Sequence, residues 1–105
     1  MARAIYSTRF IASSGLSGTA SYTVPPGFVA VIRSWTIFHG VELSGIEATL
    51  QGPNPVKIAV YQDVGASAAS DEWTGRTVLY AGESMSVTVE AGNVDTTVSG
   101  YLLTA

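Results

Sequence analysis

Alternation of apolar and polar residues with a period of two dominates the chain, and turn residues separate the alternating stretches. The strictest case is residues 84–90, in which Met85, Val87 and Val89 alternate with serine, threonine and glutamate. Such alternation predicts β-strands that are buried on one face. No stretch shows the 3.6-residue period of an amphipathic helix. We therefore expect an all-β protein.

About eight strands joined by short turns are predicted, which favours a two-sheet antiparallel sandwich of jelly-roll type. The 105 residues suit one hydrophobic core, and no linker or repeat divides them, so we expect a single domain over residues 1–105. The expected strands are residues 4–12, 19–24, 28–38, 46–50, 56–61, 77–80, 84–90 and 94–103.

The strongest strand signal, residues 28–38, follows a predicted tight turn at residues 25–27 and is apolar on both faces. An antiparallel strand that faces solvent is polar on one side. This strand is therefore expected to be central and covered on both sides, or to meet another subunit. Its apolar positions are Val29, Val31, Trp35 and Ile37 on one face and Phe28, Ala30, Ile32 and Phe38 on the other.

The composition is poor in charge. Only 12% of the residues are charged, whereas 47% are hydrophobic, and a typical soluble domain has about 25% charged residues. A protein that is free in solution usually keeps a charged surface of mixed sign. A surface with so few charges is easier to explain if neighbouring subunits cover part of it. The alternative is a neutral surface rich in serine and threonine.

Charge and cysteine content exclude several classes of partner. The net charge is −3 and the five basic residues are scattered, so the basic patch of a nucleic-acid-binding protein is missing. No cysteine is present for disulfides or thiolate ligands. Residues 1–12 lack the apolar core of a signal peptide, and no run approaches 18 apolar residues. We expect synthesis in a cytoplasm without a signal, and no membrane partner.

The residue types that carry catalysis or bind metals do not form a recognisable pattern. His39 is the single histidine, and no Gly-X-Ser-X-Gly motif accompanies it. We interpret His39 as a hydrogen-bonded residue at a strand end. Asp63, Asp71 and Glu72 have no spacing known from calcium loops. The sequence therefore predicts a protein that is not an enzyme and holds no cofactor or metal.

Three segments resemble small virion proteins of tailed phages that infect actinobacteria. Residues 22–33 resemble their strand, Val-Pro-X-Gly turn and long apolar strand. Residues 73–79 with Gly82 and Glu83, followed by residues 94–103, resemble the closing part of the same proteins. The three segments cover about two-fifths of the chain in the same order. The resemblance implies a structural protein with a jelly-roll-like or sandwich fold, located on a capsid or a tail, and it implies no catalytic residues.

The leading functional hypothesis is a capsid decoration (cement) protein that binds the outer surface of the head shell. Its expected partners are the major capsid protein and copies of itself, with a trimer favoured, and its expected location is the virion. Residues 1–12 are the candidate anchoring strand, because a terminal strand can add to the sheet edge of a neighbour. Arg9 and Arg33 are expected to meet acidic residues of the shell.

Residues 4–12 are expected to place Tyr6, Thr8 and Phe10 on one face and Ile5, Ser7, Arg9 and Ile11 on the other. Trp73 follows an expected mobile loop at residues 64–70 and is a candidate for partner contact, with a lid over the core as the alternative. The candidate partner-binding residues are Arg3, Ile5, Tyr6, Arg9, Phe10 and Trp73.

Two other functions remain open at this point. The first is a minor tail protein of the same fold. The second is a carbohydrate-binding module that recognises host surface glycans through Trp73 and Tyr61. Copy number per particle distinguishes the first from a decoration protein, and loss of sugar binding in a Trp73 variant identifies the second.

Overall fold

The computed structural model describes residues 5–105, which form eight β-strands and no helix. No helix in this part of the chain is therefore long and apolar enough to cross a membrane. The strands are β1 (Ile5–Leu16), β2 (Thr19–Thr23), β3 (Phe28–His39), β4 (Ile46–Gln51), β5 (Lys57–Asp63), β6 (Ala69–Leu79), β7 (Ser84–Ala91) and β8 (Val94–Thr104).

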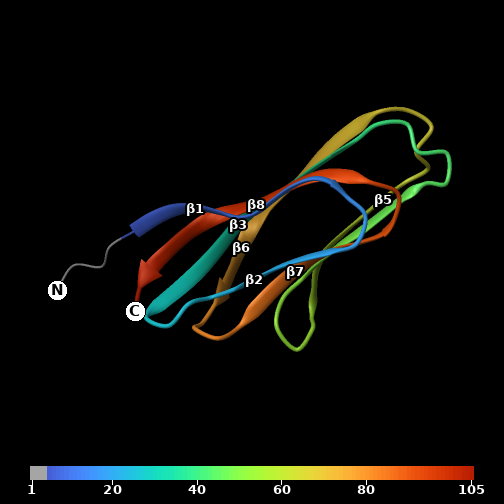
Figure 1. Ribbon diagram of the computed structural model, residues 1–105. Helices are drawn as coiled ribbons and strands as arrows, with labels where there is room; N and C mark the ends of the chain where they lie inside the picture. Colours follow the sequence, from blue (N-terminus) through green and yellow to red (C-terminus); the bar gives the residue numbers. More distant parts are fainter. Residues whose placement is uncertain (1–4) are drawn as a thin grey trace.

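The strands form two antiparallel sheets that pack face to face (Figure 1). The first sheet has the order β1-β8-β3-β6 and the second has the order β2-β7-β4-β5. Only β4 and β5 are consecutive strands of one sheet, and every other connection crosses between the sheets. This is the strand order of a jelly roll. The predicted all-β, two-sheet antiparallel sandwich with about eight strands is confirmed.

Two strands are much longer than the sequence predicts. β1 continues to Leu16 although serines and glycine follow residue 12, because β8 pairs with it as far as Val94. β6 begins at Ala69, eight residues before the predicted start, because β3 pairs with it from His39 onwards. The predicted loop at residues 64–70 therefore extends too far, because residues 69 and 70 belong to β6. In both cases ladder hydrogen bonds to a neighbouring strand outweigh a weak local strand preference.

β3 is a central strand, as predicted, but its two faces exchange at Arg33. The register shifts there against both β6 and β8, which is the effect of a β-bulge. Ala30 and Ile32 before the bulge and Trp35 after it all belong to the core. The prediction that Val31 and Trp35 share a face is wrong, because one extra residue reverses the alternation between them.

A second bulge does the same in β1. The register against β8 shifts between Arg9 and Ile11, and both Phe10 and Ile11 are buried, at 8% and 5% exposure. The prediction that Phe10 and Ile11 lie on opposite faces is therefore wrong. β1 fills the core with two consecutive side chains and keeps Arg9 on the outside.

The core lies between the two sheets and draws on all the longer strands. Its best-buried members are Ile32, Leu50, Leu79, Val87 and Val98, each with 0% exposure. Full burial of such a side chain stabilises a protein by about 1.5–3 kcal/mol relative to its exposure. The core thus supplies the rigid platform from which the outer faces of the sheets are presented.

Side-chain hydrogen bonds inside the core link two strands of the first sheet. The indole Nε1–H of Trp35 donates to Thr96 Oγ1 over 2.7 Å, and the Thr96 hydroxyl donates to the Thr36 carbonyl over 3.0 Å. The tight turn before β3 also forms as predicted. Gly27 has a φ of 83°, and the Phe28 amide donates to the Pro25 carbonyl over 3.3 Å.

Candidate functional site

The outer face of the first sheet is apolar at one end, and no other layer of the described chain covers it. Ala30 and Ile32 are core residues, so Val31 between them points outward, yet it is only 1% exposed. Its cross-strand partners are Val78 on β6 and Tyr101 on β8. By the same alternation, the residues of this apolar end are Ile5, Val29, Val31, Val78, Tyr101 and Leu103.

The middle of the same face carries a row of arginines. Arg9 pairs with Ser99, and the Ser99 hydroxyl is 2.9 Å from the hydroxyl of Ser34, the residue after the bulged Arg33. Arg76 lies in the part of β6 opposite this bulge. Neighbouring strands are about 4.8 Å apart, so this arginine row spans about 14 Å across the sheet. All three side chains are exposed, and none forms an ion pair within residues 5–105.

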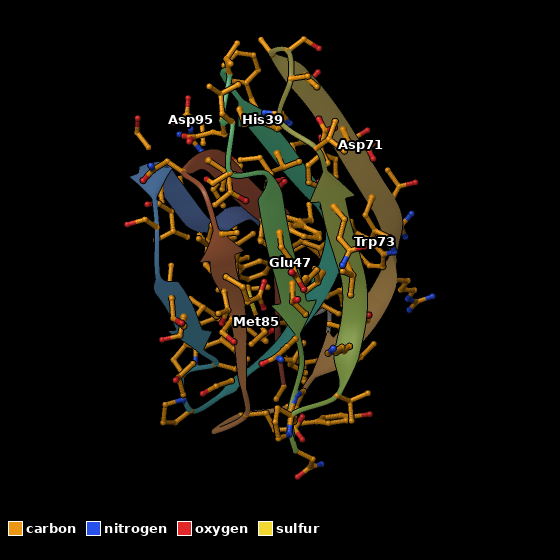
Figure 2. All side chains as sticks on the ribbon, turned by 90° about the vertical axis from the view of Figure 1, so that its right-hand side faces the viewer. His39, Glu47, Asp71, Trp73, Met85 and Asp95 are labelled. Atoms are coloured by element: carbon orange, nitrogen blue, oxygen red, sulfur yellow. The ribbon has the colours of Figure 1, made fainter. Side chains whose placement is uncertain are left out.

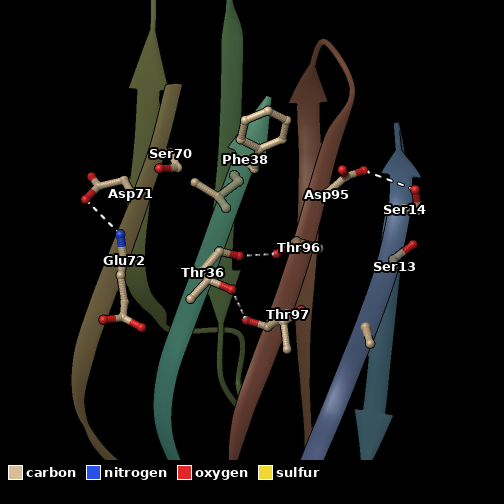
Figure 3. Close-up of a pocket in the computed structure, with 12 residues that line it drawn as sticks. Ser13, Ser14, Thr36, Phe38, Ser70, Asp71, Glu72, Asp95, Thr96 and Thr97 are labelled. Carbon is tan, nitrogen blue, oxygen red and sulfur yellow. Dashed lines mark hydrogen bonds between the residues drawn. The ribbon is translucent and has the colours of Figure 1, made fainter. Parts of the chain in front are cut away.

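A shallow groove of about 840 Å³ occupies the other end of this face (Figure 3). Its floor is built from hydroxyl-bearing positions of β3 and β8, where Thr36 Oγ1 donates to the Thr97 carbonyl over 3.4 Å. Three carboxylates and one half-exposed aromatic ring rise beside this floor. The groove lining includes Ser14, Thr36, Phe38, Ser70, Glu72 and Asp95.

Asp95 is held firmly at the rim of the groove. Its Oδ1 accepts hydrogen bonds from Ser14 Oγ over 3.2 Å and from the Gly15 amide over 2.9 Å. Glu72 has an exposed side chain without an ion pair among the described residues. Phe38 lies on β3, between β8 with Asp95 and β6 with Glu72, and 50% of its surface is exposed. The face therefore runs from apolar residues through arginines to acidic residues around one exposed ring.

The sequence-predicted partner residues are divided between the two sides of the first sheet. Ile5 is 68% exposed and lies with Arg9 on the outer face. Tyr6 points to the inner side at the end of the sandwich and packs edge-on against Phe28 at 6.0 Å. Phe10 lies in the core, 4.9 Å from the ring of Tyr22, and so does not belong to the surface. Arg3 lies outside the described residues.

The described part of the candidate anchoring segment is a strand of the domain itself. From Ile5 onward it pairs with β8, and its bulge supplies two core side chains. A free terminal strand that is available to a neighbour is therefore not what residues 5–12 form. Surface contacts from this segment are restricted to its outward residues.

Trp73 lies beside a small cleft of about 200 Å³ at the side of the sandwich where β5 and β6 run (Figure 2). It pairs with Trp35 and packs partly against the core. A Cβ on Gly75 would lie 2.5 Å from its Cζ2, so the indole ring lies over this glycine. Asp71, Glu72 and Tyr61 line the same cleft. The structure thus brings together the two aromatic residues that the sugar-binding hypothesis names.

His39 is buried at the end of β3 and fully hydrogen-bonded. Its Nδ1 donates to the Gly40 carbonyl at 2.7 Å, and its Nε2 lies 2.9 Å from both the Tyr61 hydroxyl and Asp63 Oδ2. The interpretation of His39 as a hydrogen-bonded strand-end residue is confirmed. Tyr61 also donates to Asp63 Oδ2 over 3.4 Å, so the three side chains tie β3 to β5.

Asp63 is ionised in this cluster. Desolvation raises the pKa of Asp63, but hydrogen bonds from the amides of Gly65 and Val64 and the interaction with His39 lower it more strongly, so the pKa lies below its usual value. Burial raises the pKa of Tyr61, and the neighbouring carboxylate raises it further, so its phenol stays protonated and donates. These shifts follow from a structural link between the sheets and need no substrate.

Metal-binding groups are not gathered in the described chain. Within residues 5–105, no three histidine or carboxylate side chains are close enough to hold a metal ion. Asp63 faces His39, whereas Asp71 accepts the amide of Glu72 over 2.8 Å. Of the three carboxylates considered for calcium, Asp63 and Asp71 are therefore engaged separately, and Glu72 is exposed.

The outer face of the second sheet has a different character. Its outward positions are mostly serine and threonine, and hydroxyl pairs bridge β2 and β7: Thr19 with Thr88 over 3.1 Å and Thr23 with Ser84 over 2.7 Å. Val60 is its one exposed large apolar residue within a strand, at 48% exposure. The low charge of the chain is thus explained partly by this neutral hydroxyl face and partly by the apolar end of the opposite face.

Several residues of the outer face were missed by sequence reasoning. Val78, Arg76 and Tyr101 come from strands far apart in the sequence, and only the pairing of β6 and β8 with β3 places them beside Val31. The apolar residues before Arg33 on both faces of β3 were the available signal. They indicated an outward apolar surface but not its neighbours.

Comparisons with known proteins add little. No family model matches the sequence, and no curated protein matches it. Among solved structures, the chain is similar to the core of Drosophila NLP, a protein described in terms of pentamer formation and histone binding. The two are 14% identical, the match covers 93% of this chain and 96% of the other, and the TM-score is 0.48. This likeness is too distant to bear on function or assembly.

Proposed function

We propose that this protein is a structural subunit of a tailed-phage virion, a decoration protein that binds the outer surface of the head shell and packs beside other subunits. The observation that carries the proposal is the outer face of the first sheet. Ile5 and Val78 are exposed there around the buried Val31, next to three arginines that form no ion pair within the described part of the chain. Apolar surface of this kind, bordered by polar groups, is typical of protein–protein contact sites.

The fold and the sequence resemblance support the same function. A jelly roll presents two broad faces on a rigid core, so contacts made by one face do not require the other face to change. Many copies on a shell convert a modest interface into stable attachment, because bound neighbours raise the effective concentration of each contact. The hydroxyl face of the second sheet suits the side of such a subunit that stays in water.

We expect this protein to co-purify with phage particles in hundreds of copies per particle. The measurement is quantitative mass spectrometry of gradient-purified particles, with the major capsid protein as the internal standard. A handful of copies would identify a minor tail protein of the same fold instead. Complete absence from purified particles, with the protein present in the lysate, would overturn the virion function.

Sugar binding in the cleft between β5 and β6 is a second candidate function, favoured by one observation. Trp73 and Tyr61 meet there with the carboxylates of Asp71 and Glu72. An indole face packs on the C–H side of a sugar ring, and carboxylates accept hydrogen bonds from its hydroxyls. The cleft volume of about 200 Å³ suits one sugar ring rather than a longer chain.

If this second function holds, the protein will bind purified host cell-wall polysaccharide, and Trp73→Ala will weaken binding at least about tenfold, a loss of about 1.4 kcal/mol. Calorimetric titration measures both. Tyr80→Ala is the matched control, because Tyr80 is an aromatic residue with 62% exposure that does not line the cleft. Wild-type protein that binds no polysaccharide would remove this candidate.

A further inference from the structure

We propose that the outer face of the first sheet is self-complementary and that a second copy of this chain packs on it, face to face, across a two-fold axis. The inference rests on the proposed function, because it names one neighbour for the same surface. It replaces the expected three-fold ring with a pair. The argument comes from the order of side chains along this face, from their charges and from its area.

The outward side chains of β3 follow an order that a two-fold rotation can match with itself. Val31, Ser34, Thr36 and Phe38 are its successive outward positions, with the bulged Arg33 beside Ser34. Outward positions are about 6.8 Å apart along a strand. A two-fold axis in the interface, perpendicular to β3 and between Ser34 and Thr36, reverses this order. It places Phe38 of each copy at the level of Val31 in the other, where Val78 and Tyr101 flank this buried residue.

This placement joins apolar residues to apolar residues. Phe38 is a large apolar side chain on the groove end of the face and is 50% exposed. Val31 is flanked by Val78 and Tyr101 at the opposite end. The same rotation therefore covers an exposed ring with an apolar surface twice, once in each direction. An isologous contact of this kind repeats every favourable pair.

The charges match under the same rotation. On β6, Arg76 lies between the levels of Val31 and Ser34, and Glu72 lies at the level of Thr36. The axis brings Arg76 of one copy between Ser70 and Glu72 of the other. On the opposite edge, Arg9 of one copy comes over Ala12 of the other, at the level of Thr36 and Thr97. The Arg76 guanidinium of one copy, which forms no ion pair within residues 5–105, thus comes next to the Glu72 carboxylate of the other.

A second copy is favoured over a foreign protein by this double match. A foreign partner would need an acidic group for Arg76, a basic group for Glu72, and an apolar surface on each side, all at the right spacing. A second copy supplies them at the correct spacing by symmetry alone. Twisted sheets that pack face to face keep their strand directions within about 30°, which the two-fold arrangement allows.

The area permits a dimer that depends on concentration. Four strands at about 4.8 Å and eight residues at about 3.4 Å cover roughly 19 by 27 Å. The overlap therefore buries about 500 Å² per copy and about 1,000 Å² in total, the lower limit for a specific interface. We expect a weak dimer in free solution that high local concentration on a particle would fill.

Charge exchange on β6 tests the pairing. Sedimentation equilibrium of the wild-type chain should show a monomer–dimer equilibrium. R76E and E72R should each weaken dimerisation at least about tenfold, because the two-fold axis doubles the lost attraction and replaces it with like-charge contacts. The double variant R76E/E72R should restore dimerisation, and an equimolar mixture of R76E with E72R should form a heterodimer.

Matched controls lie on the second sheet. K57E gives the same net charge as R76E, −5 from −3, and E90R gives the same net charge as E72R, −1 from −3. Both controls should dimerise like the wild-type chain. Phe38→Ser, which changes no charge, should weaken the dimer as well.

A chain that stays monomeric to millimolar concentration would overturn the pairing, as would a trimer or a dimer that neither charge exchange affects. Failure of the double variant and of the mixture to restore association would also overturn it. The particle measurement is independent. A monomer present in hundreds of copies per particle would support the proposed function and overturn the pair. A dimer absent from particles would support the pair and overturn the proposed function.

Discussion

We expect Gly100→Ala to destabilise the protein by about 3 kcal/mol, the upper part of the range for overpacked positions. Gly100 lies in β8 between Thr8 and Ile32. A Cβ at this position would overlap the carbonyl oxygen of Val31 and would lie 3.1 Å from the amide nitrogen of Arg33. Both contacts are with backbone atoms next to the bulge of β3, which cannot rotate away as a side chain can.

Urea-induced unfolding measures this change, and thermal unfolding should show a decrease in the melting temperature of about 15 °C. Gly18→Ala is the matched control, because no heavy atom lies within 4 Å of a Cβ built there and its φ is not in the left-handed region. Equal stability of the two variants would contradict the close approach of β8 to β3.

The second large effect concerns the bulge in β1. Phe10→Ala should cost about 3–4 kcal/mol and Ile11→Ala about 3 kcal/mol, because each truncation leaves a cavity between the sheets. Phe10 also loses its ring contact with Tyr22. The free energy of unfolding from denaturant titration gives both values. Two consecutive strand residues with large costs is a result that simple alternation forbids.

Ile5→Ala is the control for this pair, and it should change the stability by less than about 0.5 kcal/mol because Ile5 is 68% exposed. A neutral Ile11→Ala would restore the alternating pattern and contradict the bulge. The burial of Phe10 and Ile11 also determines the effect of truncating the N-terminal segment. Deletion of residues 1–11 removes both core side chains, so we expect it to unfold the domain and not merely to release it from a partner.

The strand count and the two-sheet class could be predicted because they depend on local alternation and turn residues. The turn at Gly27 shows this, since proline and glycine determine it within four residues. The bulges at Phe10 and Arg33 could not be predicted, because an extra residue is tolerated only where the neighbouring strand accepts a register shift. The length of β6 likewise depends on β3, since local sequence around Trp73 contains no strong strand signal.

The candidate site could be predicted only in part, for the same reason. Ile5 and Arg9 were named from a simple pattern, and both lie on the outer face. Phe10 was named with them, but the bulge turns it inward. The arginine row requires Arg76 to lie opposite Arg33, a relation that exists only after β6 and β3 pair. Long-range strand pairing brings these residues together, and the local sequence contains no signal of that pairing.

The position of the first strand has a consequence for biosynthesis. β1 lies at the edge of its sheet, and β8 is its one neighbour there, although nearly 80 residues separate the two strands in the chain. A nascent chain therefore carries an unpaired strand with Phe10 and Ile11 uncovered until the ribosome has added β8. Pairing over such sequence distances is slow, on the order of milliseconds to seconds. Folding of this domain must wait until β8 has been synthesised, and in that interval the uncovered strand is the part of the domain most exposed to aggregation or to chaperones.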